Sequence, residues 1–153
     1  MAQRRNACRP GAVATDGFAG TAVTGDLVMG MARNRGVAGL VTDGMVRDVA
    51  GIITVGLPVF CAGVTPNSPA RNGPGLVGFP VSVGGVSVAS GDIIIADNDG
   101  VVVVSQGMIA DVLERLPAIR ASEAELEAKV KAGLEVPDFI KDIFDSGRIL
   151  EVP

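Results

Sequence analysis

Residues Val37–Asp48, which read VAGLVTDGMVRD, decide how this chain folds. Their first half is an apolar run that predicts a buried strand, and Asp43-Gly44 predicts a turn at its end. Arg47 then stands beside Asp48, so a fixed cation and a hard oxygen ligand follow the end of the expected strand. Because charged side chains are costly to bury, this pair indicates a site that meets a ligand or a partner.

The elements around this stretch alternate between helix and strand. Thr24 is expected to cap a helix that runs to about Arg35, where Gly36 stops it. The elements expected after it are a strand over 37–42, a helix over 48–55 ended by Gly56, and a strand over 58–62. This order predicts a parallel layer in an α/β fold.

A long loop and two hairpins are expected next. Residues 63–78 are rich in Pro, Gly, Asn and Ser, and such a loop is typically functional or crosses to another subunit. Gly84-Gly85 predicts a tight hairpin between strands at 79–83 and 86–89. A second reversal at 97–100 is expected between strands at 92–96 and 101–105, which makes this part a compact β half.

The C-terminal part predicts helices. An amphipathic stripe over 109–116 is expected to end at Pro117, and a charged helix is expected over 119–131. Phe139, Ile140, Ile143 and Phe144 form a last apolar patch that is expected to dock on another surface. We therefore expect a leader over 1–12 that is disordered or non-native, and one domain over 13–153 with a helical tail from about 107.

Composition excludes several kinds of chemistry. The 153 residues include no His, Trp or Tyr, which rules out a Ser-His-Asp triad and histidine acid–base catalysis. The net charge of -4 and the absence of a basic aromatic patch argue against nucleic acid as a partner. The two cysteines, Cys8 and Cys61, are expected to be reduced thiols of a cytoplasmic protein. No apolar run is long enough for a membrane span, so no membrane partner is expected.

The residues from about Val13 to Ala110 resemble one family. The matching motifs are TAVTGDL (21–27), RGVAG (35–39), TDGMVRD (42–48), GLPVF (56–60), GVTP (63–66), GD (91–92) and DNDGVVVV (97–104). They resemble the 4-hydroxy-4-methyl-2-oxoglutarate aldolases, whose superfamily includes the regulator of ribonuclease E activity. The resemblance implies an α-β-β-α sandwich, similar to the swivelling β/β/α folds, in a homotrimer or a dimer of trimers.

The activity implied by the resemblance is that of a class II pyruvate aldolase that depends on Mg²⁺ or Mn²⁺. Such an enzyme cleaves 4-hydroxy-4-methyl-2-oxoglutarate or 4-carboxy-4-hydroxy-2-oxoadipate, and it decarboxylates oxaloacetate. The alternative that the resemblance leaves open is a non-catalytic protein that binds and regulates ribonuclease E. Family members usually carry a further segment before the matched stretch, so the chain is expected to be short at its N-terminus.

The resemblance also assigns roles to particular residues. Asp48 matches the metal ligand, although the residues alone favour an aspartate that stabilises the dipole of helix 48–55. Arg47 matches the arginine that binds the substrate carboxylate, with a surface ion pair as the alternative. The backbone of Gly25, Asp26, Leu27 and Val28 matches a helix start that receives the anionic substrate.

Two acidic residues complete the expected site. Asp26 either orients a water bound to the metal or stabilises its own helix N-terminus, and the residues do not choose between these roles. A tail carboxylate from a neighbouring protomer is a further family feature, and Glu123 is the best candidate by spacing. Glu125 and Glu127 compete with Glu123, and the simplest alternative is a solvated helix face.

Overall fold

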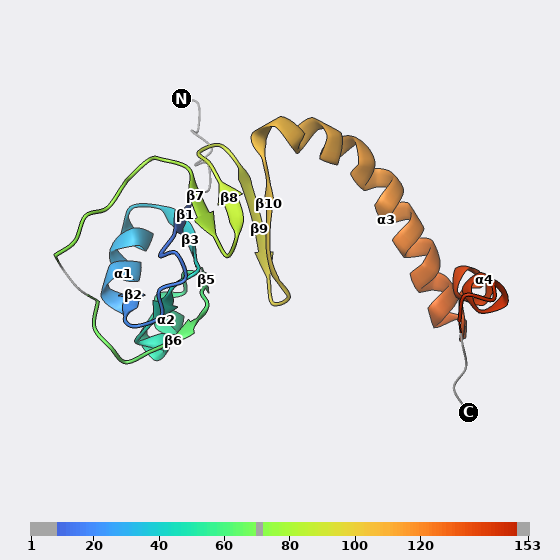
Figure 1. Cartoon of the computed structure of the whole chain (residues 1–153), viewed down its shortest axis with the longest axis horizontal. Coiled ribbons are helices and arrows are strands. Elements are labelled where there is room, and N and C mark those ends of the chain that lie inside the picture. Colours follow the sequence, from blue (N-terminus) through green and yellow to red (C-terminus); the bar gives the residue numbers. More distant parts are fainter. Residues whose placement is uncertain (1–8, 70–71, 150–153) are drawn as a thin grey trace, which may run out of the picture. The chain divides into compact units, whose positions relative to one another are not determined.

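The computed structural model describes residues 9–69 and 72–149, which form two compact units. The first unit ends at Gly107 and the second begins at Met108. Figure 1 labels their elements, and each unit is described by itself. The expected leader over 1–12 lies outside the described residues as far as residue 8, whereas residues 9–12 belong to a strand.

The first unit is built on two small parallel sheets that share one pattern. The first sheet has the order β1-β3-β5 and the second has the order β2-β4-β6. Each odd-numbered strand lies in the first sheet, and the strand that follows it lies in the second. The chain therefore crosses from the first sheet to the second three times. The bounds are β1 Arg9–Val13, β2 Ala22–Thr24, β3 Val37–Thr42, β4 Met45–Val46, β5 Val59–Phe60 and β6 Gly63–Val64. The expected parallel layer and α/β class are confirmed.

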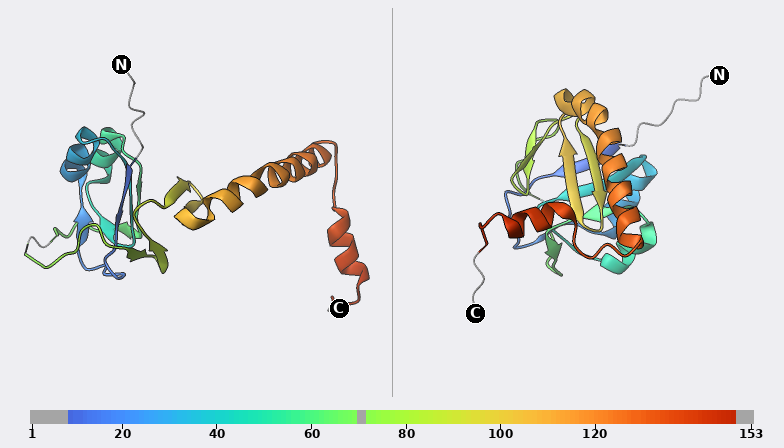
Figure 2. Two further views of the ribbon diagram at one scale, coloured as in Figure 1. Left: turned by 90° about the horizontal axis from the view of Figure 1, so that it is seen from above. Right: turned by 90° about the vertical axis from the view of Figure 1, so that its right-hand side faces the viewer.

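A helix follows each of the first two even strands. Helix α1, Asp26–Asn34, follows β2, and helix α2, Val49–Val55, follows β4. The two helices pack side by side (Figure 2). Gly56 ends α2 with a φ of 71°, as the sequence predicts, since a left-handed backbone favours glycine there.

The predicted cap of α1 is wrong. Gly25 occupies the cap position, and the Thr24 hydroxyl lies 3.4 Å from the Gly25 carbonyl oxygen instead of accepting from the helix. Thr24 is the last residue of β2 and is buried, so its side chain is committed to the sheet. Inside the first turn, the Asp26 carboxylate accepts the Leu27 N–H at 2.7 Å.

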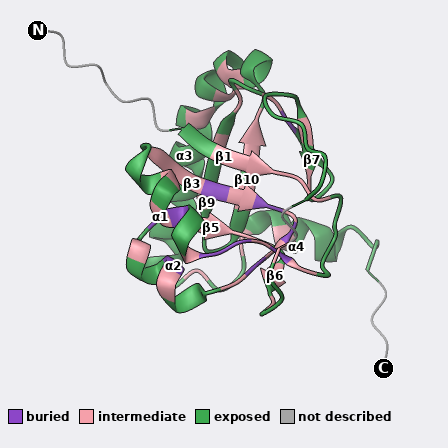
Figure 3. Ribbon diagram, turned by 90° about the vertical axis from the view of Figure 1, so that its left-hand side faces the viewer, coloured by how far each residue is buried: buried purple, intermediate pink, exposed green. Residues whose placement is uncertain are grey.

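The core lies between the sheets and these helices. Figure 3 shows buried segments in β3 and in neighbouring elements of the first unit. The central cluster consists of Met29, Leu40, Val46, Ile52 and Leu57. Burying apolar side chains of this size contributes roughly 1.5–3 kcal/mol each. This cluster is the hydrophobic core of the first unit.

Two antiparallel hairpins complete the first unit. Strands β7 Val81–Val83 and β8 Val86–Val88 pair across Gly84-Gly85, as predicted. Strands β9 Ile93–Asp97 and β10 Gly100–Val104 pair across Asn98-Asp99, so the second reversal is tighter than expected. A half-open apolar cavity of about 930 Å³ lies between β3, β5 and the hairpins, and the free thiol of Cys61 lines it. Cys8 lies outside the described residues.

The second unit is helical. After the short turn η1, Gln106–Met108, helix α3 spans Ile109–Lys131 and helix α4 spans Asp138–Asp145. The predicted break at Pro117 is wrong, because α3 continues through it. Proline removes one helical hydrogen bond, and the long run of helix formers on both sides outweighs that loss. None of the helices in the described parts of the chain is long and apolar enough to cross a bilayer.

Asp43 ties two of the sheet changes together. Its Oδ1 accepts the Thr15 N–H at 2.7 Å and the Thr15 hydroxyl at 3.0 Å, and its Oδ2 accepts the Gly17 N–H at 3.3 Å. Burial opposes ionisation of this carboxyl, but the hydrogen bonds from Thr15 and Gly17 outweigh it and hold the pKa of Asp43 below its usual value. The segment between β1 and β2 is therefore fixed to the turn between β3 and β4.

Asp43→Asn is expected to lower the free energy of unfolding by about 1 kcal/mol near neutral pH, because the amide loses the charge and one acceptor oxygen. The folded-state pKa is lowered, so this contribution is present above the unfolded pKa of about 3.9 and is lost as the pH falls through the folded value. The difference between wild type and variant should therefore narrow below about pH 4. Urea unfolding at neutral and acidic pH measures it. Asp99→Asn, at an exposed hairpin turn, is the matched control.

Candidate functional site

The candidate site lies at the carboxyl edge of the β2-β4-β6 sheet. Because the strands are parallel, the segments that follow them meet at the same edge. These segments are Gly25-Asp26 after β2, Arg47-Asp48 after β4 and residues 65–68 after β6. The Arg47 N–H donates to the Thr24 carbonyl oxygen at 3.1 Å, so the first two segments are joined directly.

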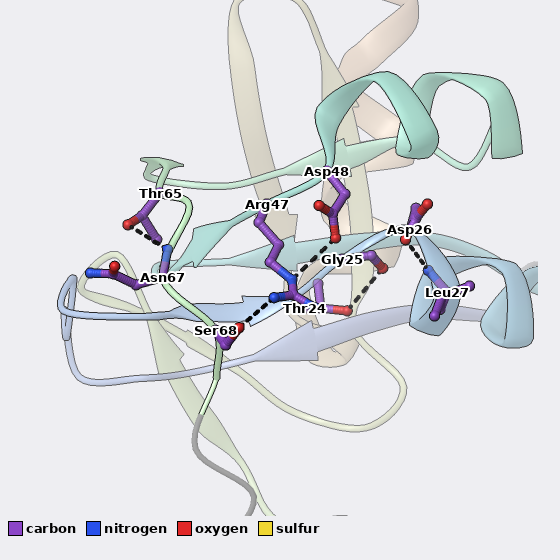
Figure 4. Close-up of polar contacts among 9 residues, drawn as sticks. All are labelled: Thr24, Gly25, Asp26, Leu27, Arg47, Asp48, Thr65, Asn67 and Ser68. Atoms are coloured by element: carbon purple, nitrogen blue, oxygen red, sulfur yellow. Dashed lines mark hydrogen bonds and ion pairs between the residues drawn. The ribbon is translucent and has the colours of Figure 1, made fainter.

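Arg47 is held from two sides, as Figure 4 shows. Its Nη1 donates a hydrogen bond of 2.6 Å to the Ser68 hydroxyl. Its Nε is buried and lies 3.1 Å from Asp48 Oδ2, an ion-pair distance without hydrogen-bonding geometry. The side chain remains 35% exposed, so the guanidinium is fixed but still reaches solvent. A cation held in this way suits a carboxylate ligand.

Asp48 adopts a conformation that most residues avoid. Its φ of 57° and ψ of 43° lie in the left-handed region, which costs roughly 1–2 kcal/mol for a residue with a Cβ. It occupies the cap position of α2, yet its carboxylate makes no capping hydrogen bond and pairs with Arg47. Its side chain is 43% exposed. Helix capping therefore does not explain why Asp48 adopts this strained conformation. Backbone strain of this kind clusters at functional sites.

Two glycines make room for the acidic side chains. A Cβ on Gly25 would lie 2.5 Å from Asp48 Oδ2, closer than such atoms approach, and 3.2 Å from Arg47 Cγ, which is a tight contact. A Cβ on Gly51, in the first turn of α2, would overlap the Asp26 carboxylate. Gly25 is extended rather than left-handed, with φ -144°. Glycine is therefore needed at this position for the space that a side chain would fill, and not for its backbone conformation.

Asp26 lies between the first turns of α1 and α2. It accepts the Leu27 N–H and packs against Gly51, which favours stabilisation of the two helix starts as part of its role. The side chains of Leu27 and Val28 are 77% and 47% exposed. The Leu27 N–H is already occupied, so it is not available to a substrate, and any contribution of Val28 comes from its backbone.

Glu123 lies on α3 in the second unit and is exposed. Its two competitors are engaged elsewhere on the same helix: Glu125 pairs with Lys129 at 2.7 Å, and Glu127 pairs with Lys131 at 2.5 Å. Hydrogen bonding to Lys129 lowers the pKa of Glu125, and the same bond raises the pKa of Lys129. The structure thus brings together Gly25, Asp26, Arg47 and Asp48, while Glu123 belongs to the other unit.

The donor set at this edge suits a hard divalent cation. Asp48 and Asp26 offer only oxygen, and Mg²⁺ is commonly held by one or two carboxylates while water fills the remaining positions. Gly25 leaves space beside Asp48 Oδ2 that a side chain would fill. No group of three or more metal-ligating side chains occurs among residues 9–69 and 72–149. The site therefore fits a largely hydrated ion held through Asp48, not an ion enclosed by protein ligands.

Sequence reasoning missed two members of the site, Ser68 and Gly51. Ser68 follows β6 in the loop singled out as functional, and its place at the carboxyl edge is the signal that could have found it. Gly51 carries no sequence signal beyond a glycine inside a helix. The 930 Å³ cavity lies elsewhere in the first unit and does not include Arg47 or Asp48, so the chemistry of the site and not cavity size identifies it.

Comparison with known proteins identifies the family to which the chain belongs. Residues 5–103 match the model of the RraA-like family, described as Aldolase/RraA. The chain is 38% identical over 111 residues to a Halalkalibacterium halodurans protein named "Putative 4-hydroxy-4-methyl-2-oxoglutarate aldolase". This match covers 72% of the chain and 51% of the relative. The chain spans about half the length of the curated relatives it matches.

Two solved structures are similar in fold. An uncharacterised protein from Pseudomonas syringae pv. tomato matches with a TM-score of 0.75 at 27% identity, covering 84% of this chain and 66% of that one. RraAS2 of Streptomyces coelicolor matches with a TM-score of 0.68 at 30% identity, covering 80% and 62%. The latter is described as an unusual member of the RNase ES inhibitor RraA protein family.

Proposed function

The chain belongs to the RraA-like Aldolase/RraA family, and from that premise we propose that it is a carbon–carbon lyase of the class II pyruvate aldolase type. The substrates are α-keto acids such as 4-hydroxy-4-methyl-2-oxoglutarate or 4-carboxy-4-hydroxy-2-oxoadipate, with oxaloacetate decarboxylation as a further reaction. The observation that carries the proposal is the pairing of Arg47 with a strained, uncapped Asp48 at the carboxyl edge of a parallel sheet.

Each residue of the site has a part in this proposal. Asp48 holds Mg²⁺ or Mn²⁺, and Arg47 binds the carboxylate of the keto acid. The bound ion would supply Lewis-acid polarisation of the keto oxygen. The backbone at the start of α1, from Gly25 to Val28, offers the positive end of a helix dipole to the anion.

Proton handling falls to the acidic residues. In the decarboxylation of oxaloacetate, the bond to the departing carboxylate breaks, carbon dioxide leaves, and the electron pair remains on pyruvate as an enolate. The enolate then takes a proton from a water that Asp26 orients, and this converts it to pyruvate. Glu123 of a neighbouring copy completes the site in a trimer or a dimer of trimers, and the protein works in the cytoplasm.

The purified chain is expected to convert oxaloacetate to pyruvate in the presence of Mg²⁺, because the site holds both a metal ligand and a carboxylate clamp. Pyruvate is measured with a coupled lactate dehydrogenase assay, and EDTA should abolish the reaction. Buffer with the same Mg²⁺ concentration corrects for decarboxylation by free metal. A rate equal to that of this buffer would contradict the proposal.

A second function is supported by the likeness to RraAS2, which is described within an RNase ES inhibitor family. In this function the chain masks a ribonuclease E-type partner without catalysis. A pull-down against ribonuclease E, run with wild type and Asp48→Asn, separates the two functions, since masking does not need a metal ligand.

A further inference from the structure

Ser68 contacts Arg47, the cation to which the proposed function assigns the substrate carboxylate. Its hydroxyl accepts a hydrogen bond of 2.6 Å from Arg47 Nη1, which is short even for a bond from a charged donor. Ser68 is distant from Arg47 in sequence and belongs to the loop that follows β6. The contact therefore depends on how that loop is attached to the sheet.

The loop is anchored immediately before Ser68. The Thr65 N–H donates to the Val46 carbonyl oxygen at 2.9 Å, and the Ala22 N–H donates to the Asn67 carbonyl oxygen at 3.0 Å. The Asn67 side-chain amide adds a bond of 3.0 Å to the Gly20 carbonyl oxygen. These bonds fix residues 65–67 to β4 and to the segment at β2, so the sheet itself places the Ser68 hydroxyl.

Two of the three side-chain nitrogens of Arg47 therefore contact a neighbouring side chain. Ser68 holds Nη1, and Asp48 Oδ2 faces Nε at 3.1 Å. A guanidinium is planar and rigid, so contacts at two of its nitrogens restrict its rotation. With only one of the two contacts, the fork could rotate about its last bonds.

We propose that Ser68 is a positioning residue, which orients Arg47 for recognition of the substrate carboxylate. This inference rests on the proposed function, because it assigns Arg47 the carboxylate of an α-keto acid. Ser68 does not touch the reacting atoms. Its loss should therefore weaken substrate binding more than it slows the chemical step.

The kinetic test compares three variants in the Mg²⁺-dependent oxaloacetate assay. Ser68→Ala is expected to raise KM about tenfold with kcat changed less than about threefold. Ser68→Thr keeps the hydroxyl and should restore KM to near the wild-type value. Ser87→Ala, an exposed serine on β8, is the matched control and should leave both constants unchanged. An unchanged KM in Ser68→Ala would overturn the inference while the lyase function stands.

A second measurement does not need turnover. In the ¹⁵N NMR spectrum of the Arg47 side chain, the held guanidinium should give separate, slowly exchanging Nη signals. Ser68→Ala should merge them through faster rotation, and Ser68→Thr should keep them apart. Merged signals in the wild type would overturn the inference even if the protein is active. A wild type that is inactive and does not bind oxalate with Mg²⁺ would overturn the lyase function and the substrate role of Ser68 together.

Discussion

Asp48→Asn is expected to reduce the Mg²⁺-dependent decarboxylation of oxaloacetate by at least about 100-fold, since loss of an indirect metal partner alone costs 10–100-fold. Asparagine has nearly the same shape and tolerates the left-handed backbone, so the fold should be retained. The neutral amide is a much weaker ligand for Mg²⁺ than the carboxylate. Mg²⁺ should raise the melting temperature of the wild type but not that of the variant. Calorimetry or thermal melting with and without Mg²⁺ measures this difference.

Asp16→Asn is the matched control for this variant. Asp16 is the other non-glycine residue with a positive φ in the described chain, at 53°, and it lies outside the candidate site. The same chemical change at the same kind of backbone position should therefore leave activity and the Mg²⁺ response unchanged. If Asp48→Asn keeps its rate, or if Asp16→Asn loses activity equally, Asp48 is not the metal ligand.

Gly25→Ala is expected to lower kcat/KM for oxaloacetate by about 100-fold, through displacement of side chains and not through removal of any of them. The new Cβ would fall 2.5 Å from Asp48 Oδ2 and 3.3 Å from Arg47 Nε, so both charged groups must move. The extended backbone of Gly25 accepts alanine without strain. The effect should therefore appear in activity and in Mg²⁺ affinity more than in the free energy of unfolding.

Gly30→Ala offers a control on the same helix. Its added Cβ would have only Val55 Cγ2 near it, at 4.0 Å, which is ordinary van der Waals contact. Alanine inside a helix stabilises it by roughly 0.5–1 kcal/mol relative to glycine. Gly30→Ala should thus raise the unfolding midpoint and leave kinetics unchanged. Equal kinetics for Gly25→Ala and wild type would show that the space beside Gly25 is not needed.

The strand at 37–42, two of the turns and the charged pair followed directly from the sequence. The apolar run at 37–42 forms β3 with the predicted bounds, and Gly84-Gly85 and Gly56 perform the turns expected of them. These features depend on local preferences that a few neighbouring residues determine. Arg47 and Asp48 could be identified because a chain without histidine offers few other groups for such chemistry.

The remaining features depend on contacts between distant parts of the chain. The double sheet arises because each strand pair changes sheet at a turn such as Asp43-Gly44, and nothing in one turn reveals its partners. Ser68 meets Arg47 only because parallel strands align their ends. Thr24 has the right chemistry for a helix cap, but burial at the end of β2 prevents it. Pro117 was judged on local preference alone, which a long helix overrides.

The left-handed backbone of Asp48 has a consequence for protein engineering. Glycine at this position should remove the steric cost of the Cβ, so Asp48→Gly is expected to raise the free energy of unfolding by about 0.5 kcal/mol. A laboratory selection for heat tolerance that does not also demand turnover would therefore enrich variants that have lost Asp48, the proposed metal ligand. Thermostable variants of this chain therefore need to be assayed for catalysis in every round of selection.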